Sequence, residues 1–239
     1  MAQVINTNVA SLFGQQALNK SASGLQTAMQ RLSSGLRINN AKDDATGMAN
    51  AAVFESQMRG ANQALRNAND GIAKAQINDG YHAQVLENLQ RQREIAVQQG
   101  GTATSTEATA LVTENTRLLG LAVATGSVVV ESDGGTVTGL ATAAASITAG
   151  LTIASIDAAI TAVTTARAKY GADMATFSSA AASLGTEAVN AAAQYSRVMD
   201  TDYAVETTNM IRNQILQQAG TAMLAQANQV PNSVLSLLR

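Results

Sequence analysis

A seam of apolar and small residues, spaced alternately three and four positions apart, runs through the C-terminal half of this 239-residue chain. This is the spacing of a heptad repeat, in which one face of a helix packs against a partner helix. The seam lasts for about six repeats, which short apolar runs do not imitate, and it predicts a helix roughly 70 Å long. Only Arg167 is neither apolar nor small. The members are Ile153, Ile156, Ile160, Val163, Arg167, Tyr170, Met174, Phe177, Ala181, Leu184, Ala188, Ala191, Tyr195 and Val198.

A second seam upstream has the same spacing and predicts the partner helix. Many of its members are alanine, which lets two helices approach closely, and its phase shifts near Gly80. A compact chain of this length would have a radius of gyration of about 18 Å, so we expect an elongated rod of paired helices. The members are Ala51, Phe54, Met58, Ala61, Leu65, Ala68, Ile72 and Ala75, followed after the shift by Leu86 and Leu89.

Both ends of the chain are nearly free of charge. The first 30 residues carry one ionisable side chain, Lys20, and the last 36 carry three, Glu206, Arg212 and Arg239. Both ends show apolar residues at helical spacing, yet a helix that faces water normally has a charged outer stripe. We therefore expect the ends to be covered on more than one side by copies of the same chain. The expected polymer interface comprises Ile5, Val9, Leu12, Leu18, Leu25, Leu32, Ile211, Ile215, Leu216, Leu224, Leu235 and Leu238.

Two segments interrupt the helical pattern. Residues 33–40 contain Ser, Gly and a pair of Asn, which predict a break, and Asp43 and Asp44 then stand where carboxylates cap a helix. Residues 100–150 are rich in Thr, Gly, Ala and Ser, with a possible short helix at 107–119. Within them, residues 127–130 and 136–138 flank Asp133–Gly134, a turn sequence that predicts a small β-hairpin.

The predicted fold is therefore mainly α: a long antiparallel coiled-coil rod with paired terminal helices and a small β-hairpin in the middle. We expect three regions. Residues 1–36 and 204–239 form the inner core of the polymer, residues 37–100 and 151–203 form the rod, and residues 101–150 form a short outer connector.

Composition argues against enzymatic and nucleic-acid functions. The chain has no cysteine and one histidine, His82, which we place on a helix surface without partners, and its net charge is −2. There is no nucleophile–base arrangement and no phosphate loop, and capping explains Asp43 and Asp44 better than metal binding does. We expect no catalytic, cofactor or metal site and no nucleic-acid partner. Residues 141–163 are long enough to cross a membrane but too rich in Ser and Thr, so no membrane contact is expected.

Several longer motifs resemble those of bacterial flagellins. One is RLSSGLRINNAKDDA at residues 31–45, after the first predicted helix. The others lie at the C-terminus: DTDYA at 200–204, QILQQAG at 214–220, LAQANQVP at 224–231 and VLSLLR at 234–239. The resemblance covers residues 1–100 and 150–239, in the same order as in the family.

The resemblance implies a structural subunit that self-assembles into the extracellular flagellar filament for motility, not an enzyme. It also implies export through the flagellar channel without a cleaved signal, with an export chaperone and cap and junction proteins as partners. The middle departs from the family, because the further helix of typical flagellins is hard to recognise in residues 102–124. The alternative is a hook–filament junction protein, which shares the terminal helices. An adhesin would need a substantial surface domain, and the middle of this chain is too short for one.

A second implied partner is the Toll-like receptor for flagellin. Residues 89–98 (LQRQREIAVQ) resemble the stretch that this receptor binds, with Leu89, Arg91 and Glu94 as the candidate contacts. Gln92 and Ile95 depart from the family pattern. The alternative is a core helix that carries two surface charges.

Overall fold

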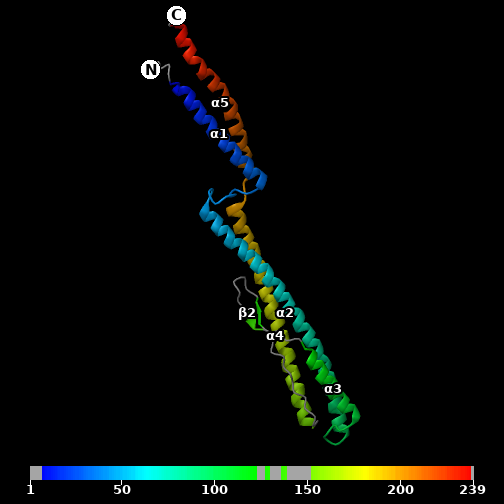
Figure 1. The fold of residues 1–239 in the computed structure, drawn as a ribbon. Helices are drawn as coiled ribbons and strands as arrows, with labels where there is room; N and C mark the ends of the chain where they lie inside the picture. Colours follow the sequence, from blue (N-terminus) through cyan, green and yellow to red (C-terminus); the bar gives the residue numbers. More distant parts are fainter. Residues whose placement is uncertain (1–6, 123–126, 130–135, 139–151, 238–239) are drawn as a thin grey trace. The chain divides into compact units, whose positions relative to one another are not determined.

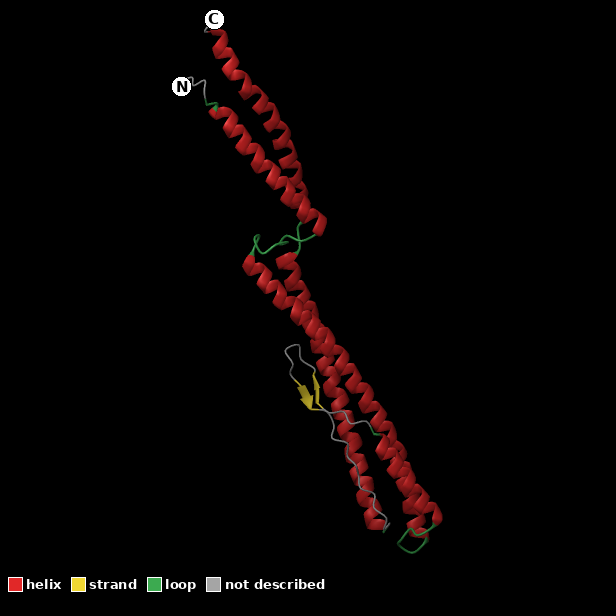
Figure 2. Ribbon diagram, viewed as in Figure 1, coloured by secondary structure: helices red, strands yellow, loops and turns green. Residues whose placement is uncertain are grey.

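The computed structural model describes residues 7–122, 127–129, 136–138 and 152–237, and these ranges are mainly helical, as predicted (Figures 1 and 2). The elements, in chain order, are helix α1 (Val9–Ser34), helix α2 (Ala45–Gln98), helix α3 (Thr106–Leu121), strand β1 (Ser127–Val129), strand β2 (Thr136–Thr138), helix α4 (Ile153–Met199) and helix α5 (Tyr203–Leu237). The chain forms two compact units, one of residues 1–53 and 193–239 and the other of residues 54–192.

In the second unit, α2 and α4 lie side by side and antiparallel, with large side chains of α4 set against small ones of α2. Leu184 packs with Ala61 and Ala64, and Phe177 packs with Ala68. One heptad further back, Tyr170 packs with Ala75. Each step of seven residues back along α4 is thus matched by seven forward along α2. This confirms the antiparallel coiled coil that the two seams predicted.

The buried stripe of α2 continues without a phase shift, so the shift expected near Gly80 is wrong. From Ala61 to Ala96 a series of buried positions alternates by three and four residues, and Ile95, next to Ala96, is buried as well. The sequence pattern looked broken because three positions of the series are polar. The members of the series are Ala61, Ala64, Ala68, Gly71, Ala75, Asn78, His82, Val85, Leu89, Gln92 and Ala96.

His82 is one of these polar positions, and the expectation that it lies on the surface is also wrong. Its side chain is 1% exposed, its Nδ1 atom lies 2.8 Å from the backbone oxygen of Asn78, and its ring packs edge-on against Tyr170 with centroids 5.0 Å apart. The helical spacing of α2 decides this, because His82 occupies a seam position. Its place between two helices makes it a packing residue.

Arg167, the exception in the α4 seam, has a partner on α2. Its Nε donates to Oδ1 of Asp79 at 2.7 Å, and its Nη2 donates to Oδ2 at 3.3 Å. Both side chains are about one-third exposed, so the guanidinium stays partly hydrated at the edge of the seam. The hydrogen bond that Arg167 donates to Asp79 raises the pKa of Arg167 and keeps the charge pair intact.

Helix α3 packs against the α2–α4 pair. Ala108 and Leu118 join the same apolar cluster as Leu89 of α2 and Ile156 of α4. The side chain of Ser105 accepts a hydrogen bond from the backbone N–H of Ala108 and caps the helix. A helix is therefore present within residues 102–124, where its pattern was hard to recognise, and this confirms the short helix expected at 107–119.

Strands β1 and β2 pair antiparallel, with Val128 opposite Val137. The residues that join them, with the expected Asp133–Gly134 turn, lie outside the described residues, so the complete hairpin stays a prediction. Much of the segment weighed as a membrane span also lies there. Within the ranges that the structure describes, no helix combines the length and apolar character that a bilayer span requires.

The buried hydroxyl of Tyr170 supports a test of the α2–α4 packing. Burial, and to a smaller degree the carboxylates of Asp173 and Asp79, raises the pKa of Tyr170. The neutral phenol therefore stabilises the fold fully below about pH 10, its ordinary value in an unfolded chain, and this contribution is lost as the pH rises toward the higher folded value.

We predict that Tyr170→Phe weakens the decline of the unfolding free energy above pH 10 and costs less than about 1 kcal/mol at neutral pH, because the hydroxyl has no hydrogen-bond partner. Urea unfolding between pH 7 and 11 measures this. Tyr203→Phe, at a residue that is 56% exposed, is the matched control and should keep the decline. An equal decline in the parent and the Tyr170 variant would contradict the prediction.

Candidate functional site

The terminal helices α1 and α5 lie antiparallel at close distance in the first unit (Figure 1). Glycines permit the approach: a Cβ atom added at Gly14 would lie 3.2 Å from Cδ1 of Leu224, and one added at Gly220 would lie 3.2 Å from Cδ1 of Leu18. At Gly24 an added Cβ would meet Asn213 at 2.9 Å. A larger residue at any of these glycines would crowd the facing side chain, which would have to shift.

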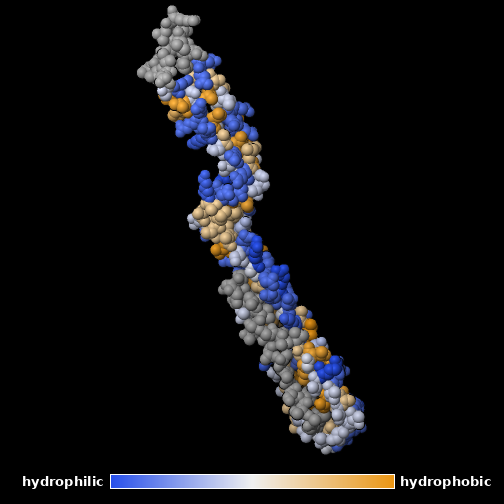
Figure 3. Space-filling model, viewed as in Figure 1, coloured by the Kyte–Doolittle hydropathy of each residue, from blue (hydrophilic) through white to orange (hydrophobic). Residues whose placement is uncertain are grey.

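The side chains that α1 buries against α5 are small. Ser21 and Ala28 are the buried residues of α1, whereas many large apolar side chains of the pair stay exposed. On the face that Figure 3 draws, hydrophobic and hydrophilic residues of these helices lie open side by side. The exposed large apolar residues of the two helices are Val9, Leu12, Phe13, Met29, Tyr203, Val205, Ile211, Ile215, Leu216 and Met223.

The exposed residues of α5 lie on more than one face. Residues 206, 213 and 220 follow each other at heptad spacing on the side that meets α1. At 100° per residue, Ile211 and Ile215 fall on the opposite side, and they are 51% and 59% exposed. Leu216 and Met223 fall between these two sides. Helix α5 therefore carries more apolar surface than α1 covers.

A groove runs along one side of the α1–α5 pair. Its volume is near 750 Å³, and Lys20 is the single charged residue among those that line it. Gly14, Ala17 and Gly24 form its α1 wall, and Leu216 and Met223 belong to its α5 wall. The remaining lining is small, apolar or uncharged polar, with Ser21, Ser23, Thr27 and Asn213 among it, so the groove offers one ionisable group and no acid–base pair for catalysis.

The predicted interface residues fall into three groups. Val9, Leu12, Ile211, Ile215 and Leu216 are exposed, and Leu18, Leu25, Leu32 and Leu224 are partly buried. Ile5 and Leu238 lie outside the described residues, and of Leu235 the structure gives the helical backbone alone. Sequence reasoning missed Phe13 and Met223, which are 73% and 67% exposed, because neither falls in the three–four series.

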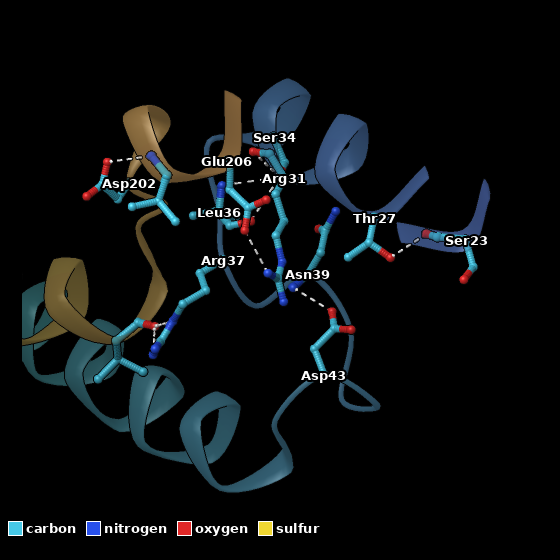
Figure 4. Close-up of polar contacts among 12 residues, drawn as sticks. Ser23, Thr27, Arg31, Ser34, Leu36, Arg37, Asn39, Asp43, Asp202 and Glu206 are labelled. Carbon is cyan, nitrogen blue, oxygen red and sulfur yellow. Dashed lines mark hydrogen bonds and ion pairs between the residues drawn. The ribbon is translucent and has the colours of Figure 1, made fainter. Parts of the chain in front are cut away.

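A short crossing of two chain segments joins the helix pair to the neighbouring ends of α2 and α4. The N–H of Arg37 donates to the backbone oxygen of Met199 at 2.6 Å, and the N–H of Thr201 donates to that of Gly35 at 2.9 Å. Gly35 ends α1 in the left-handed region with φ 73°, which favours glycine. The guanidinium of Arg37 donates to the backbone oxygen of Val198 at 2.7 Å (Figure 4).

The two acidic residues predicted to cap α2 have different roles. Oδ1 of Asp44 accepts from the N–H of Gly47 at 2.8 Å, which is the expected cap. Asp43 does not cap the helix: its Oδ2 accepts from the N–H groups of Asn39 and Asn40, at 3.2 and 3.1 Å, and holds the preceding turn. The turn brings its carboxylate back along the chain, which helix spacing alone does not reveal.

One ion pair links the two terminal helices across their interface. Nη1 of Arg31 lies 2.8 Å from Oε1 of Glu206, and Glu206 is 7% exposed (Figure 4). Asp202 caps α5 beside it by accepting from the N–H of Ala204 at 2.9 Å. Sequence reasoning missed this pair, although each residue is among the few charges of its helix.

The candidate receptor residues do not form one exposed patch. Leu89 is fully buried in the core of the second unit, whereas Arg91 and Glu94 are exposed. Arg91 pairs with Glu94 at 3.1 Å and with Glu107 of α3 at 2.9 Å. These hydrogen bonds to Glu107 and Glu94 raise the pKa of Arg91. Within the described ranges no cluster of three or more His, Cys, Asp or Glu residues is placed to hold a metal ion.

Comparison with known proteins matches both halves of the chain. Residues 5–122 match the bacterial flagellin N-terminal helical region, and residues 153–238 match the bacterial flagellin C-terminal helical region. The chain belongs to the bacterial flagellin family. This is a family of structural proteins and not of enzymes.

Full-length relatives agree with this assignment. The flagellar filament 33 kDa core protein of Treponema phagedenis is 35% identical over 285 aligned positions, which cover 99% of this flagellin and all of the relative. A flagellin of Xenorhabdus nematophila is 35% identical over 313 positions, with both chains covered in full. A Salmonella typhimurium flagellin is 57% identical over 105 residues, which are 44% of this chain and 21% of the relative.

The cap of α2 gives a test of the region where α2 starts. We predict that Asp44→Ala lowers the unfolding free energy by about 1 kcal/mol, because the N–H of Gly47 loses its acceptor. Lys42→Ala, at a nearby exposed residue, is the control and should change it by less than about 0.5 kcal/mol. Urea unfolding measures both. Equal effects of the two substitutions would contradict the capping role.

Proposed function

We propose that this flagellin is the structural subunit of a bacterial flagellar filament and that it self-assembles through its terminal helices. Family membership supports the filament role and the homopolymer. The single observation that carries the assembly mechanism is the surface of α5. Ile211 and Ile215 point away from α1 and are more than half exposed, and no described part of the chain covers them, so another copy of the chain can.

The energetic argument follows from composition. Full burial of a large apolar side chain contributes about 1.5–3 kcal/mol, and among the residues whose side chains the structure describes the terminal helices expose ten of this kind. Charges that water would have to solvate are rare on these helices, so burial has a small desolvation cost. We therefore expect the terminal helices to become ordered on assembly, where contacts with other copies offset the ordering entropy.

The proposal also assigns a structural role to each of three regions of the chain. Residues 1–36 and 204–239 form the inner core of the filament, residues 37–100 and 151–203 form a coiled-coil rod, and residues 101–150 form a short outer connector with a small hairpin. The pairing of α2 with α4 and of β1 with β2 supports the second and third parts. The filament places the subunit in the extracellular flagellum.

Further partners belong to the same proposal. A flagellar export chaperone and cap and junction proteins are expected from the family. A Toll-like receptor is a possible partner at the surface around Arg91 and Glu94, which are exposed. Leu89 is fully buried and would support this surface from within instead of touching the receptor.

Seeded growth tests the proposal. Purified protein is added to sheared filament fragments, and growth is followed by electron microscopy and sedimentation. We expect long filaments to grow from the seeds. Protein that only caps the seed ends would support the junction alternative, and protein that stays monomeric would contradict self-assembly.

The exposed face of α5 can be tested at one position. We predict that Ile215→Asp reduces seeded elongation at least ten-fold, because an unpaired carboxylate would be buried between subunits. Ile215→Val is the matched control, keeps the apolar contact and should elongate like the parent. Circular dichroism of the soluble proteins checks that residues 54–192 stay folded in both. Normal elongation of the Asp variant would contradict the role of this face.

Removal of residues 224–239 gives a second test. This truncation deletes the Leu224 contact with Gly14 and the end of α5, but no residue of the second unit. We predict loss of filaments with unchanged unfolding of the α2–α4 pair, measured by sedimentation and by urea titration. Normal filaments from the truncated chain would refute the terminal-helix mechanism.

A further inference from the structure

The packing between α1 and α5 repeats every seven residues. On α1 the small residues Gly14, Ser21 and Ala28 alternate with leucines along one less exposed series, and Ser11, Ala22, Gly24 and Arg31 beside it are partly buried as well. Those leucines are Leu18, Leu25 and Leu32, and each lies seven residues from the next. Shape and apolar character along this face are therefore nearly the same after a shift of one heptad.

The facing side of α5 has the same period. One series of less exposed positions runs from Glu206 to Ala227 in steps of four and three residues, and Thr207 and Asn209 beside it are partly buried as well. The members are Glu206, Met210, Asn213, Gln217, Gly220, Leu224 and Ala227. A slide of seven residues, or about 10 Å, would again place seam residues opposite seam residues. Apolar packing alone selects weakly between these registers.

Glu206 distinguishes between these registers. It is 7% exposed, and its carboxylate meets Nη1 of Arg31 at 2.8 Å. Within the described residues α1 has two charged side chains, Lys20 and Arg31, and α5 has Glu206 and Arg212. A slide of seven residues would set Glu206 beside the Gly24–Leu25 turn or beyond the end of α1. In the slide toward Gly24 the carboxylate would leave Arg31 and lie against uncharged seam residues, where an unpaired buried charge is strongly unfavourable.

We infer that the Arg31–Glu206 ion pair determines the register in which α1 packs on α5, and thereby the surface that the subunit presents for assembly. The pair acts as a positioning device, comparable to a single polar residue that fixes the register of a coiled coil. This inference rests on the proposed function, because register matters when the pair is covered by other subunits. The backbone bonds between Gly35–Arg37 and Met199–Thr201 lie close by and are the competing determinant of register.

The absence of cysteine in the chain makes the register measurable by disulfide formation. The Cβ position of Gly14 lies 4.0 Å from Cβ of Leu224, within the range that disulfides require. The pair Gly14→Cys with Leu224→Cys therefore reports the native register. Gly14→Cys with Gln217→Cys, seven residues earlier on α5, reports the slipped register and is its matched control.

The experiment places three charge states in each cysteine background: the parent, Arg31→Glu, and the exchange Arg31→Glu with Glu206→Arg. Each protein is oxidised mildly in seeded filaments and, in parallel, as soluble protein with a stabilising osmolyte, which favours burial. We expect Arg31→Glu to lower the 14–224 cross-link at least ten-fold and the exchange to restore it. The 14–217 cross-link should appear only with Arg31→Glu.

Two outcomes would overturn the inference. A full 14–224 cross-link in Arg31→Glu would show that the backbone crossing sets the register alone, and failure of the exchange to restore it would show that pairing is not the cause. The measurement on soluble protein distinguishes failure of the register inference from failure of the proposed function. Suppose that the parent never elongates, but that in soluble protein the 14–224 cross-link is lost with Arg31→Glu and restored by the exchange. The filament proposal then fails and the register inference stands.

Discussion

A helix that belongs to a two-helix pair can bury one stripe of its surface against its partner, and α5 carries apolar residues on more than one stripe. Gly220 and Leu224 meet α1, while Ile211 and Ile215 face the other way and remain more than half exposed. Small residues on the inner side let the two helices come close, and that closeness leaves the large side chains outside. The α1–α5 pair needs further protein around it because its large apolar residues lie on the outer side.

In the α2–α4 pair the large residues lie on the opposite side from those of the α1–α5 pair. There the large side chains of Tyr170, Phe177 and Leu184 point inward and pack against alanines, so the two helices bury these side chains between them. Both pairs use a seven-residue period and small residues at the contact. The side on which the large residues stand decides whether a pair closes within one chain or stays open for others.

Sequence spacing predicted the α4 helix, its seam and its antiparallel partner, because apolar periodicity over many turns has one structural solution. It failed at Asn78, His82 and Gln92, where polar side chains occupy buried seam positions and imitate a phase shift. It also did not single out Phe13 and Met223, which are 73% and 67% exposed and belong to no three–four series. The Arg31–Glu206 pair joins residues 175 positions apart, and a single sequence holds no signal for such a contact.

The central claim is that the terminal helices depend on other subunits for their burial. Backbone hydrogen exchange of the soluble protein and of assembled filaments tests it directly. The account predicts that amides of residues 9–34 and 203–229 exchange quickly in the soluble chain and slow by at least a hundred-fold in filaments, while amides between residues 54 and 98 are protected in both. Equal protection of the terminal helices in the two states would contradict it.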